Sequence, residues 1–201
     1  MVRVPYIDVE TLDPIPVDPS PYDPDWISTH NIHRAMANHP EALRVFWPRI
    51  GTWIRGKSSL EPRLRELAII QASYITASGY EFSHHVHYAE QVGVTHEEVL
   101  AIIAETNGEK STLSELERNV LKAARDLTVD LQIDDATWSF LEEQLGHVPL
   151  IELVLVTSYY NHIIRLVAAL QIGVDGGEEG EAALASYLER YPPPHQIGRW
   201  R

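Results

Sequence analysis

The sequence has 201 residues and a formal net charge of −13, with 44% hydrophobic residues, 22% charged residues and no cysteine. This length favours one domain, and the ordinary composition argues against wholesale disorder or a fibrous repeat. The negative charge argues against a nucleic-acid partner, because phosphate backbones would be repelled. The absence of cysteine excludes disulfides, thiolate metal sites and thiol nucleophiles.

The first part of the chain is rich in proline and aspartate. Residues 4–26 contain six prolines, which lack the amide donor of a helix and whose rings clash with a helical backbone. We therefore expect an extended arm over residues 1–26, which either lies along a groove of the same or a neighbouring subunit or forms a solvated tail. No apolar run approaches the roughly 20 residues that cross a bilayer, and the first residues lack the apolar core of a secretion signal. These features predict a cytoplasmic protein with no membrane partner.

Helix signals follow from Ser28 onward. Two short helices are predicted up to His39 and from Pro40 to about Ile54. The next helix starts near Ser59 and buries one face until Gly79 breaks it. A second helix over residues 80–92 stops at Gly93. Two capping boxes then open the two following helices, and their residue pairs are Thr95 with Glu98 and Ser114 with Glu117.

The second half of the chain continues this pattern. Asp134 or Asp135 caps a helix to Leu145, and Pro149 begins a long helix to Ile172 that is apolar on nearly every side. Such a helix must be buried in the core or between subunits. An acidic linker over residues 173–180 precedes a last helix over residues 181–191. No segment alternates convincingly like a strand, so the sequence predicts an all-α bundle of about eight helices as one domain over residues 27–191, followed by a tail over residues 192–201.

The candidate chemistry lies where two predicted helices meet. Glu81 and His85 are four residues apart, which places both side chains on one face of a helix. Glu66 lies on the preceding helix, and the break at Gly79 allows the two helices to fold against each other. A carboxylate beside an imidazole forms a proton-transferring pair. The plainer interpretation is an ordinary surface pair that stabilises the helix by a few tenths of a kcal/mol.

The spacing of these residues resembles the carboxymuconolactone decarboxylase and alkylhydroperoxidase D superfamily, over roughly residues 40–172. The family pattern is a glutamate, then a Cys-x-x-Cys pair, then a histidine four residues beyond the second cysteine. Glu66 and His85 match the glutamate and the histidine, whereas Ser78 and Glu81 stand at the two cysteine positions. Disulfide-linked peroxide reduction needs two thiols, so the resemblance does not extend to thiol peroxidase activity.

The resemblance implies an AhpD-like helical bundle that assembles as a homo-oligomer, a trimer or a hexamer. It also implies a lyase or decarboxylase that works without a cofactor, by acid/base chemistry on a small carboxylated or lactone compound, as in aromatic compound degradation. The alternatives are another proton-transfer enzyme, such as an isomerase or hydrolase, and a non-catalytic oligomeric binding protein. The expected catalytic residues are Glu66, Glu81 and His85, and the expected substrate-binding residues are Tyr80, Tyr88, Tyr160 and Asn161.

A metal site is the other chemistry that these residue types suggest. Imidazole and carboxylate groups are good ligands for zinc or iron, and His84, His85 and His87 lie close to Glu81 in the sequence. However, His87 is rotated well away from the helix face that Glu81 and His85 share. We therefore expect no metal and no cofactor, with a small-molecule substrate as the partner.

Overall fold

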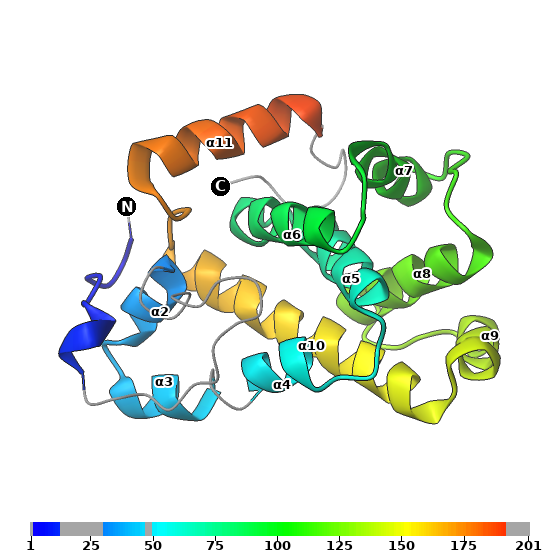
Figure 1. Ribbon diagram of the computed structural model, residues 1–201, viewed down its shortest axis with the longest axis horizontal. Helices are drawn as coiled ribbons and strands as arrows, with labels where there is room; N and C mark the ends of the chain where they lie inside the picture. Colours follow the sequence, from blue (N-terminus) through cyan, green and yellow to red (C-terminus); the bar gives the residue numbers. More distant parts are fainter. Residues whose placement is uncertain (1, 13–29, 47–49, 192–201) are drawn as a thin grey trace. The chain divides into compact units, whose positions relative to one another are not determined.

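The computed structural model describes residues 2–12, 30–46 and 50–191, which consist of helices joined by turns and loops (Figure 1). These residues form ten α-helices and one short 3-10 helix, with no strand among them. The predicted all-α class is therefore confirmed. Two compact units result, one from residues 1–58 and 166–183 and the other from residues 59–165 and 184–201. The single domain over residues 27–191 stays a prediction, and the tail over residues 192–201 lies outside the described residues.

Short helices make up the first unit. They are η1 (Val9–Thr11), α2 (Asn31–Met36), α3 (Pro40–Phe46) and α4 (Thr52–Gly56). The prediction of one helix from Pro40 to Ile54 is wrong, because α3 ends at Phe46 and α4 begins at Thr52. Pro48 stands between them in the sequence, and a proline inside a helix removes one hydrogen bond and clashes with the preceding turn. This interruption partly explains why the structure has more helices than predicted.

The start of the N-terminal arm packs on its own chain within this unit. The backbone N–H of Arg3 donates to the carbonyl of Leu170 at 2.9 Å, and the N–H of Gly173 donates to the Tyr6 hydroxyl at 3.1 Å. Apart from η1, residues 2–12 form no helix. The extended arm over residues 1–26 stays a prediction, and residues 13–26 of it lie outside the described residues.

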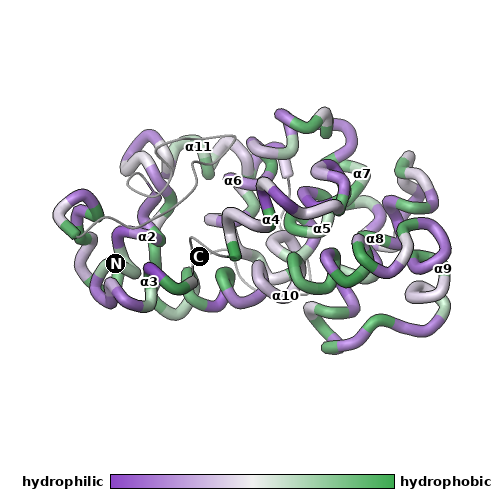
Figure 2. Tube along the Cα trace, turned by 60° about the horizontal axis from the view of Figure 1, so that its bottom comes forward, coloured by the Kyte–Doolittle hydropathy of each residue, from purple (hydrophilic) through white to green (hydrophobic). Residues whose placement is uncertain are grey.

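The second unit is built around α5 (Pro62–Ile75), whose residues are buried from Leu64 to Ile75. It packs against α6 (Gly79–Gln91), α7 (His96–Thr106) and α8 (Glu115–Val129). The apolar residues that recur along α5 and α8 can be followed in Figure 2. Both predicted capping boxes are present, one at the start of α7 and one at the start of α8. Local sequence therefore sets where these helices begin, and burial sets which faces meet.

The remaining helices are α9 (Asp135–Leu145), α10 (His147–Leu170) and α11 (Gly177–Arg190). Asp134 caps α9 by accepting from the backbone N–H groups of Ala136 and Thr137 at 3.0 Å. Helix α10 begins two residues earlier than predicted. The acidic segment predicted as a linker up to Gly180 is already helical from Gly177, since glutamates near a helix N-terminus are favoured by the helix dipole.

Helix α10 is long and apolar enough, by length and composition, to cross a membrane, and it is the one described helix that meets both criteria. The expectation that no apolar segment approaches this length is therefore wrong. The core helix of a soluble protein passes the same test. Leu150, Leu153 and Val156 on α10 are fully buried inside the protein, so α10 also fits the role of a core helix.

Glu152 is a buried carboxylate that joins α10 to the start of the segment leading into α5. Its Oε2 atom accepts hydrogen bonds from the Ser59 hydroxyl and from the Leu60 backbone N–H, both at 2.7 Å. Losing the acceptor of a buried donor costs about 1–3 kcal/mol. We expect Glu152→Ala to lower the free energy of unfolding by about 2 kcal/mol in urea denaturation. The exposed Glu143 on α9 provides the control Glu143→Ala, which should change stability by less than about 0.5 kcal/mol; equal effects of the two substitutions would contradict the prediction.

Candidate active site

The connection between α5 and α6 is a short reversal of the chain. After α5 ends at Ile75, Ala77 adopts a left-handed backbone with φ of 53°. The Ser78 N–H then donates to the Ser73 carbonyl at 2.9 Å, and the Ser78 hydroxyl caps α6 by accepting from the Glu81 N–H. Gly79 is the first residue of α6 rather than the break itself. Ser78 therefore has a structural role as a helix cap.

This reversal brings the three predicted catalytic residues together in the interior. The Nδ1 atom of His85 on α6 lies 2.6 Å from Oε2 of Glu66 on α5. The Nε2 atom of the same ring lies 3.5 Å from Oε2 of Glu81, one turn earlier on α6. Glu66, Glu81 and His85 are 0%, 4% and 1% exposed, so the interpretation as an ordinary surface pair is wrong for Glu81 and His85.

Arg65 is a fourth member of this cluster that the sequence did not single out. Its Nε lies 3.0 Å from Oε1 of Glu66, and its side chain is 2% exposed. Residues that follow directly on a helix do not normally face each other, so the spacing gave no reason to pair Arg65 with Glu66. The sequence signal that could have found Arg65 was its position in a predicted helix that buries one face. A buried guanidinium beside a buried carboxylate keeps both charges compensated.

Two of the four expected substrate-binding residues flank the imidazole. The ring centroids of Tyr88 and Tyr160 lie 5.6 and 4.6 Å from that of His85, and both rings meet it edge-on. The other two make different contacts: the Tyr80 ring lies 4.5 Å from the His84 ring, and the Asn161 amide donates to the Thr128 hydroxyl at 2.8 Å. Substrate binding by all four stays a prediction.

His87 does not join the buried cluster. Its ring is 62% exposed, and its nearest acidic partner is Glu90 at 3.9 Å, itself 58% exposed. Helix α6 thus carries one exposed pair, His87 with Glu90, and one buried pair, Glu81 with His85. This contrast provides matched controls for the substitutions described below.

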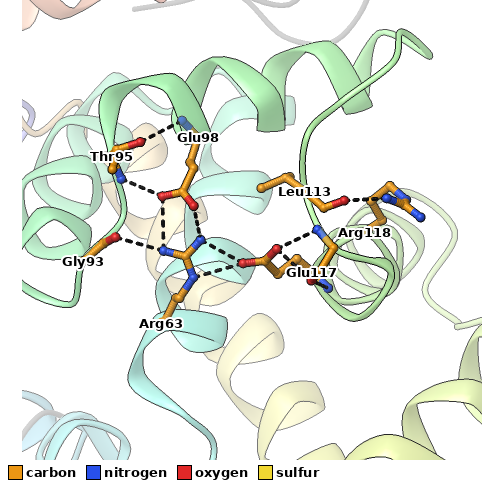
Figure 3. Close-up of polar contacts among 8 residues, drawn as sticks. Arg63, Gly93, Thr95, Glu98, Leu113, Glu117 and Arg118 are labelled. Atoms are coloured by element: carbon orange, nitrogen blue, oxygen red, sulfur yellow. Dashed lines mark hydrogen bonds and ion pairs between the residues drawn. The ribbon is translucent and has the colours of Figure 1, made fainter.

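A second charged cluster fixes the start of α5 close to the starts of α7 and α8 (Figure 3). The Arg63 guanidinium contacts Glu98 at 2.5 Å and Glu117 at 2.8 Å, and it also donates to the Gly93 carbonyl at 3.0 Å. Glu98 and Glu117 are the acidic members of the two capping boxes. One arginine therefore links three helix starts, and we call Arg63, Glu98 and Glu117 the arginine clamp.

The clamp shifts the pKa values of its members in the direction of the charged forms. The hydrogen bond from Arg63 lowers the pKa of Glu98, although burial opposes this shift. Burial raises the pKa of Glu117, but bonds from Ser114 and Arg63 outweigh it, so the net shift is downward. The bond to Glu98 is the largest cause of the raised pKa of Arg63. These pKa shifts mean that the clamp is a network of charged groups that stabilises the fold. It lies one helical turn before Glu66.

Glu66, Glu81 and His85 can perform proton transfer. When Glu66 is ionised it accepts from Nδ1–H of His85, which leaves Nε2 as the ring nitrogen that exchanges a proton. Glu81 faces that nitrogen at a distance too long for a strong hydrogen bond. An imidazole oriented by one carboxylate and facing a second is an arrangement suited to general acid/base catalysis.

Residues 40–125 match the model of the Carboxymuconolactone decarboxylase family. The matched stretch includes α5 and α6 with Glu66, Glu81 and His85, so the predicted resemblance to this family is confirmed. Tyr160 on α10 lies beyond it. No curated protein matches the chain significantly.

Two solved structures share the fold at low sequence identity. One is a protein of unknown function from Agrobacterium tumefaciens, suggested to be the antioxidant defence protein AhpD, with a TM-score of 0.62 and 16% identity over 69% of this chain and 94% of that one. The other is the debrominase Bmp8 with one cysteine replaced by alanine, in complex with 2,3,4-tribromopyrrole. It has a TM-score of 0.65 and 19% identity over 78% of this chain and 82% of that one. The AhpD-like helical fold is thereby confirmed.

Proposed function

We propose that this protein is a cofactor-independent lyase that decarboxylates a small carboxylated or lactone compound by acid/base chemistry. The observation that carries the proposal is the buried contact of 2.6 Å between His85 and Glu66. An ionised Glu66 favours a proton on Nδ1 of the ring, and Nε2 is then the atom that serves the substrate. Glu81 is the second carboxylate of the site and acts at Nε2, the ring nitrogen that does not contact Glu66.

The reaction needs one bond to break and one to form. The bond between a carbon and its carboxylate breaks, CO2 leaves, and the electron pair remains on that carbon, delocalised into a neighbouring carbonyl or lactone group. Protonated His85 then donates its Nε2 proton to the carbon, and solvent returns a proton to the ring. The negative charge of Glu81 stabilises the imidazolium that donates this proton.

The proposal excludes the thiol chemistry associated with AhpD. The chain has no cysteine, and Ser78 caps a helix where the family pattern has its first thiol. Bmp8 removes bromine, and its variant binds tribromopyrrole; at 19% identity it supports the scaffold for this chain and not that substrate. We further propose a cytoplasmic homo-oligomer with a small-molecule substrate, acting in aromatic compound degradation.

The decisive experiment follows carboxymuconolactone and a panel of small β-keto acids in D2O by NMR, with ¹³C at the carboxylate. The wild type is expected to release labelled CO2 and to place deuterium on the carbon that loses it. Glu81→Gln and His85→Gln should each reduce this turnover by roughly 10²- to 10⁴-fold, the usual contribution of general acid/base catalysis.

Glu90→Gln and His87→Gln are the matched controls, since they change the same residue types at exposed positions of the same helix. Both should retain wild-type turnover. Folded Glu81→Gln and His85→Gln variants with undiminished turnover would contradict the assigned roles. Deuterium incorporation without CO2 release would instead indicate an isomerase built from the same groups. A folded wild type that neither releases CO2 nor exchanges protons would favour a non-catalytic binding protein.

A further inference from the structure

Helix α10 has a second apolar face, which the described residues leave exposed. Val148, Ile151 and Leu155 are 62%, 52% and 49% exposed. They follow one another at spacings of three and four residues, which places them in one stripe along the helix. We propose that a second copy of the chain docks on this stripe, through an antiparallel pair of α10 helices related by a two-fold axis near Leu155. The proposal specifies the interface of the homo-oligomer proposed above and does not depend on the proposed reaction.

The stripe carries no charge, although the protein as a whole is strongly acidic. Between His147 and Arg165, the only carboxylate, lysine or arginine of α10 is Glu152. Glu152 is buried and accepts hydrogen bonds from Ser59 and Leu60. The formal net charge of −13 makes two copies repel each other, and the repulsion is weakest where a face without charge lies between them. The apolar side chains of that face gain free energy by leaving water.

The two ends of the stripe carry opposite charges. At its N-terminal end, Oε1 of Glu142 lies 3.3 Å from Nε2 of His147, which places a carboxylate of α9 beside the first turn of α10. At its other end, the Arg165 guanidinium donates to the backbone and side-chain oxygens of Asn161 at 2.6 and 2.9 Å. Within the described part of the chain, Arg165 makes no ion pair. Its charge is therefore available to a carboxylate of another chain.

The geometry of α10 determines which arrangement of two copies brings these charges together. His147 and Arg165 are 18 residues apart, which is about five full turns, so both point from the same edge of the stripe. They lie about 12 Å and about 15 Å from Leu155, in opposite directions along the helix. A two-fold axis at Leu155, perpendicular to the helices, therefore brings Arg165 level with Glu142 of the partner subunit, and it does so twice. A parallel pair would instead bring like charges together at both ends.

A lipid surface is the rival occupant of the stripe, and the charges disfavour it. Helices that lie in a bilayer interface are rich in Lys and Arg on their polar face, and cytoplasmic membrane surfaces are negative. This chain has 29 Asp and Glu against 16 Lys and Arg, so such a surface repels it. A second copy offers one carboxylate for each Arg165 and is the occupant that the charges favour. Because the same stripe supplies both sides, the contact gives dimers or other even-numbered assemblies, such as hexamers, and no trimer.

The absence of cysteine from the chain makes disulfide cross-linking the sharpest test. Leu155→Cys places a thiol at the expected two-fold axis, where facing Cα atoms of a close helix pair come within the roughly 4.4–6.8 Å that a disulfide spans. Val129→Cys is the matched control, because Val129 is an apolar residue of α8 that is 55% exposed. Oxidation should convert most of Leu155→Cys into a covalent dimer and leave Val129→Cys monomeric on a non-reducing gel. Equal yields in the two variants, or no dimer in Leu155→Cys, would overturn the antiparallel arrangement.

Sedimentation equilibrium of the full chain, at about 1–200 μM, measures the assembly itself. The wild type should have the mass of a dimer or of another even-numbered assembly. Ile151→Glu should halve that mass, because it buries a charge at the centre of the contact, whereas Val129→Glu should leave the mass unchanged. Arg165→Glu and Glu142→Arg should each weaken the association about tenfold, and their combination should restore it to within about threefold of wild type.

Several outcomes would overturn the proposal. They are a wild type that is monomeric or trimeric throughout, an assembly whose mass Ile151→Glu does not change, and a monomer that co-sediments with phosphatidylcholine vesicles. Circular dichroism checks folding, and Val148→Glu replaces Ile151→Glu if the latter does not fold. None of these measurements involves turnover. An inactive protein that assembles through α10 would contradict the proposed function alone, and an active enzyme that stays monomeric would contradict the interface alone.

Discussion

Glu66→Gln is expected to lower the free energy of unfolding by about 3 kcal/mol, because it removes the negative charge that compensates a buried arginine. Breaking a buried ion pair from one side typically costs about 3–5 kcal/mol. Glu66 is 0% exposed and contacts both Arg65 and His85, so water cannot replace the lost charge. Urea denaturation at neutral pH, followed by circular dichroism, measures the change.

Two further variants test whether the loss of stability comes from the uncompensated charge of Arg65 or from a general sensitivity of α5 to substitution. Glu61→Gln, at the exposed N-terminal end of the same helix, should change stability by less than about 0.5 kcal/mol. The double variant Arg65→Met with Glu66→Met should recover much of the loss, since replacing a whole buried pair by apolar residues is often neutral. A double variant less stable than Glu66→Gln would show that charge compensation is not the cause.

Arg63→Met is expected to lower the free energy of unfolding by about 2–3 kcal/mol, through the loss of the arginine clamp. Hydrogen bonds to charged groups contribute roughly 1.5–3 kcal/mol each, and partial exposure of the three side chains reduces their sum. The clamp holds the starts of α5, α7 and α8 (Figure 3). Arg118→Met is the control, because Arg118 donates to one backbone carbonyl among the described residues, that of Leu113, and its loss should cost clearly less.

The clamp also predicts how stability depends on pH. The folded pKa values of Glu98 and Glu117 lie below the ordinary value of 4.5. The stabilisation of the folded state by ionised Glu98 and Glu117 is therefore complete above that value. It is lost as the pH falls through the lower folded pKa values. Between about pH 5 and pH 3 the wild type should lose stability more steeply than Arg63→Met. If the free energy of unfolding fell equally steeply with pH in the two proteins, the stabilising role of the clamp would be contradicted.

Much of the helical framework could be predicted because its signals are local. The capping boxes at Thr95 and Ser114 and the cap at Asp134 set helix starts through hydrogen bonds to residues two or three positions away. The proximity of Glu81 and His85 followed from helical periodicity. Pro48, inside the predicted helix from Pro40 to Ile54, is also a local signal, because a proline interrupts a helix.

The sequence alone determined the all-α class, the absence of thiols and the helix face that carries Glu81 and His85, because each depends on composition or on residues within one turn. The tertiary structure decided which charges are buried: it placed Glu66 against His85, Arg65 against Glu66 and Glu152 at the start of the segment before α5. Burial and pairing of a charge depend on side chains from distant parts of the chain. The free energy of a charge in the interior is set by those partners and not by its neighbours in sequence.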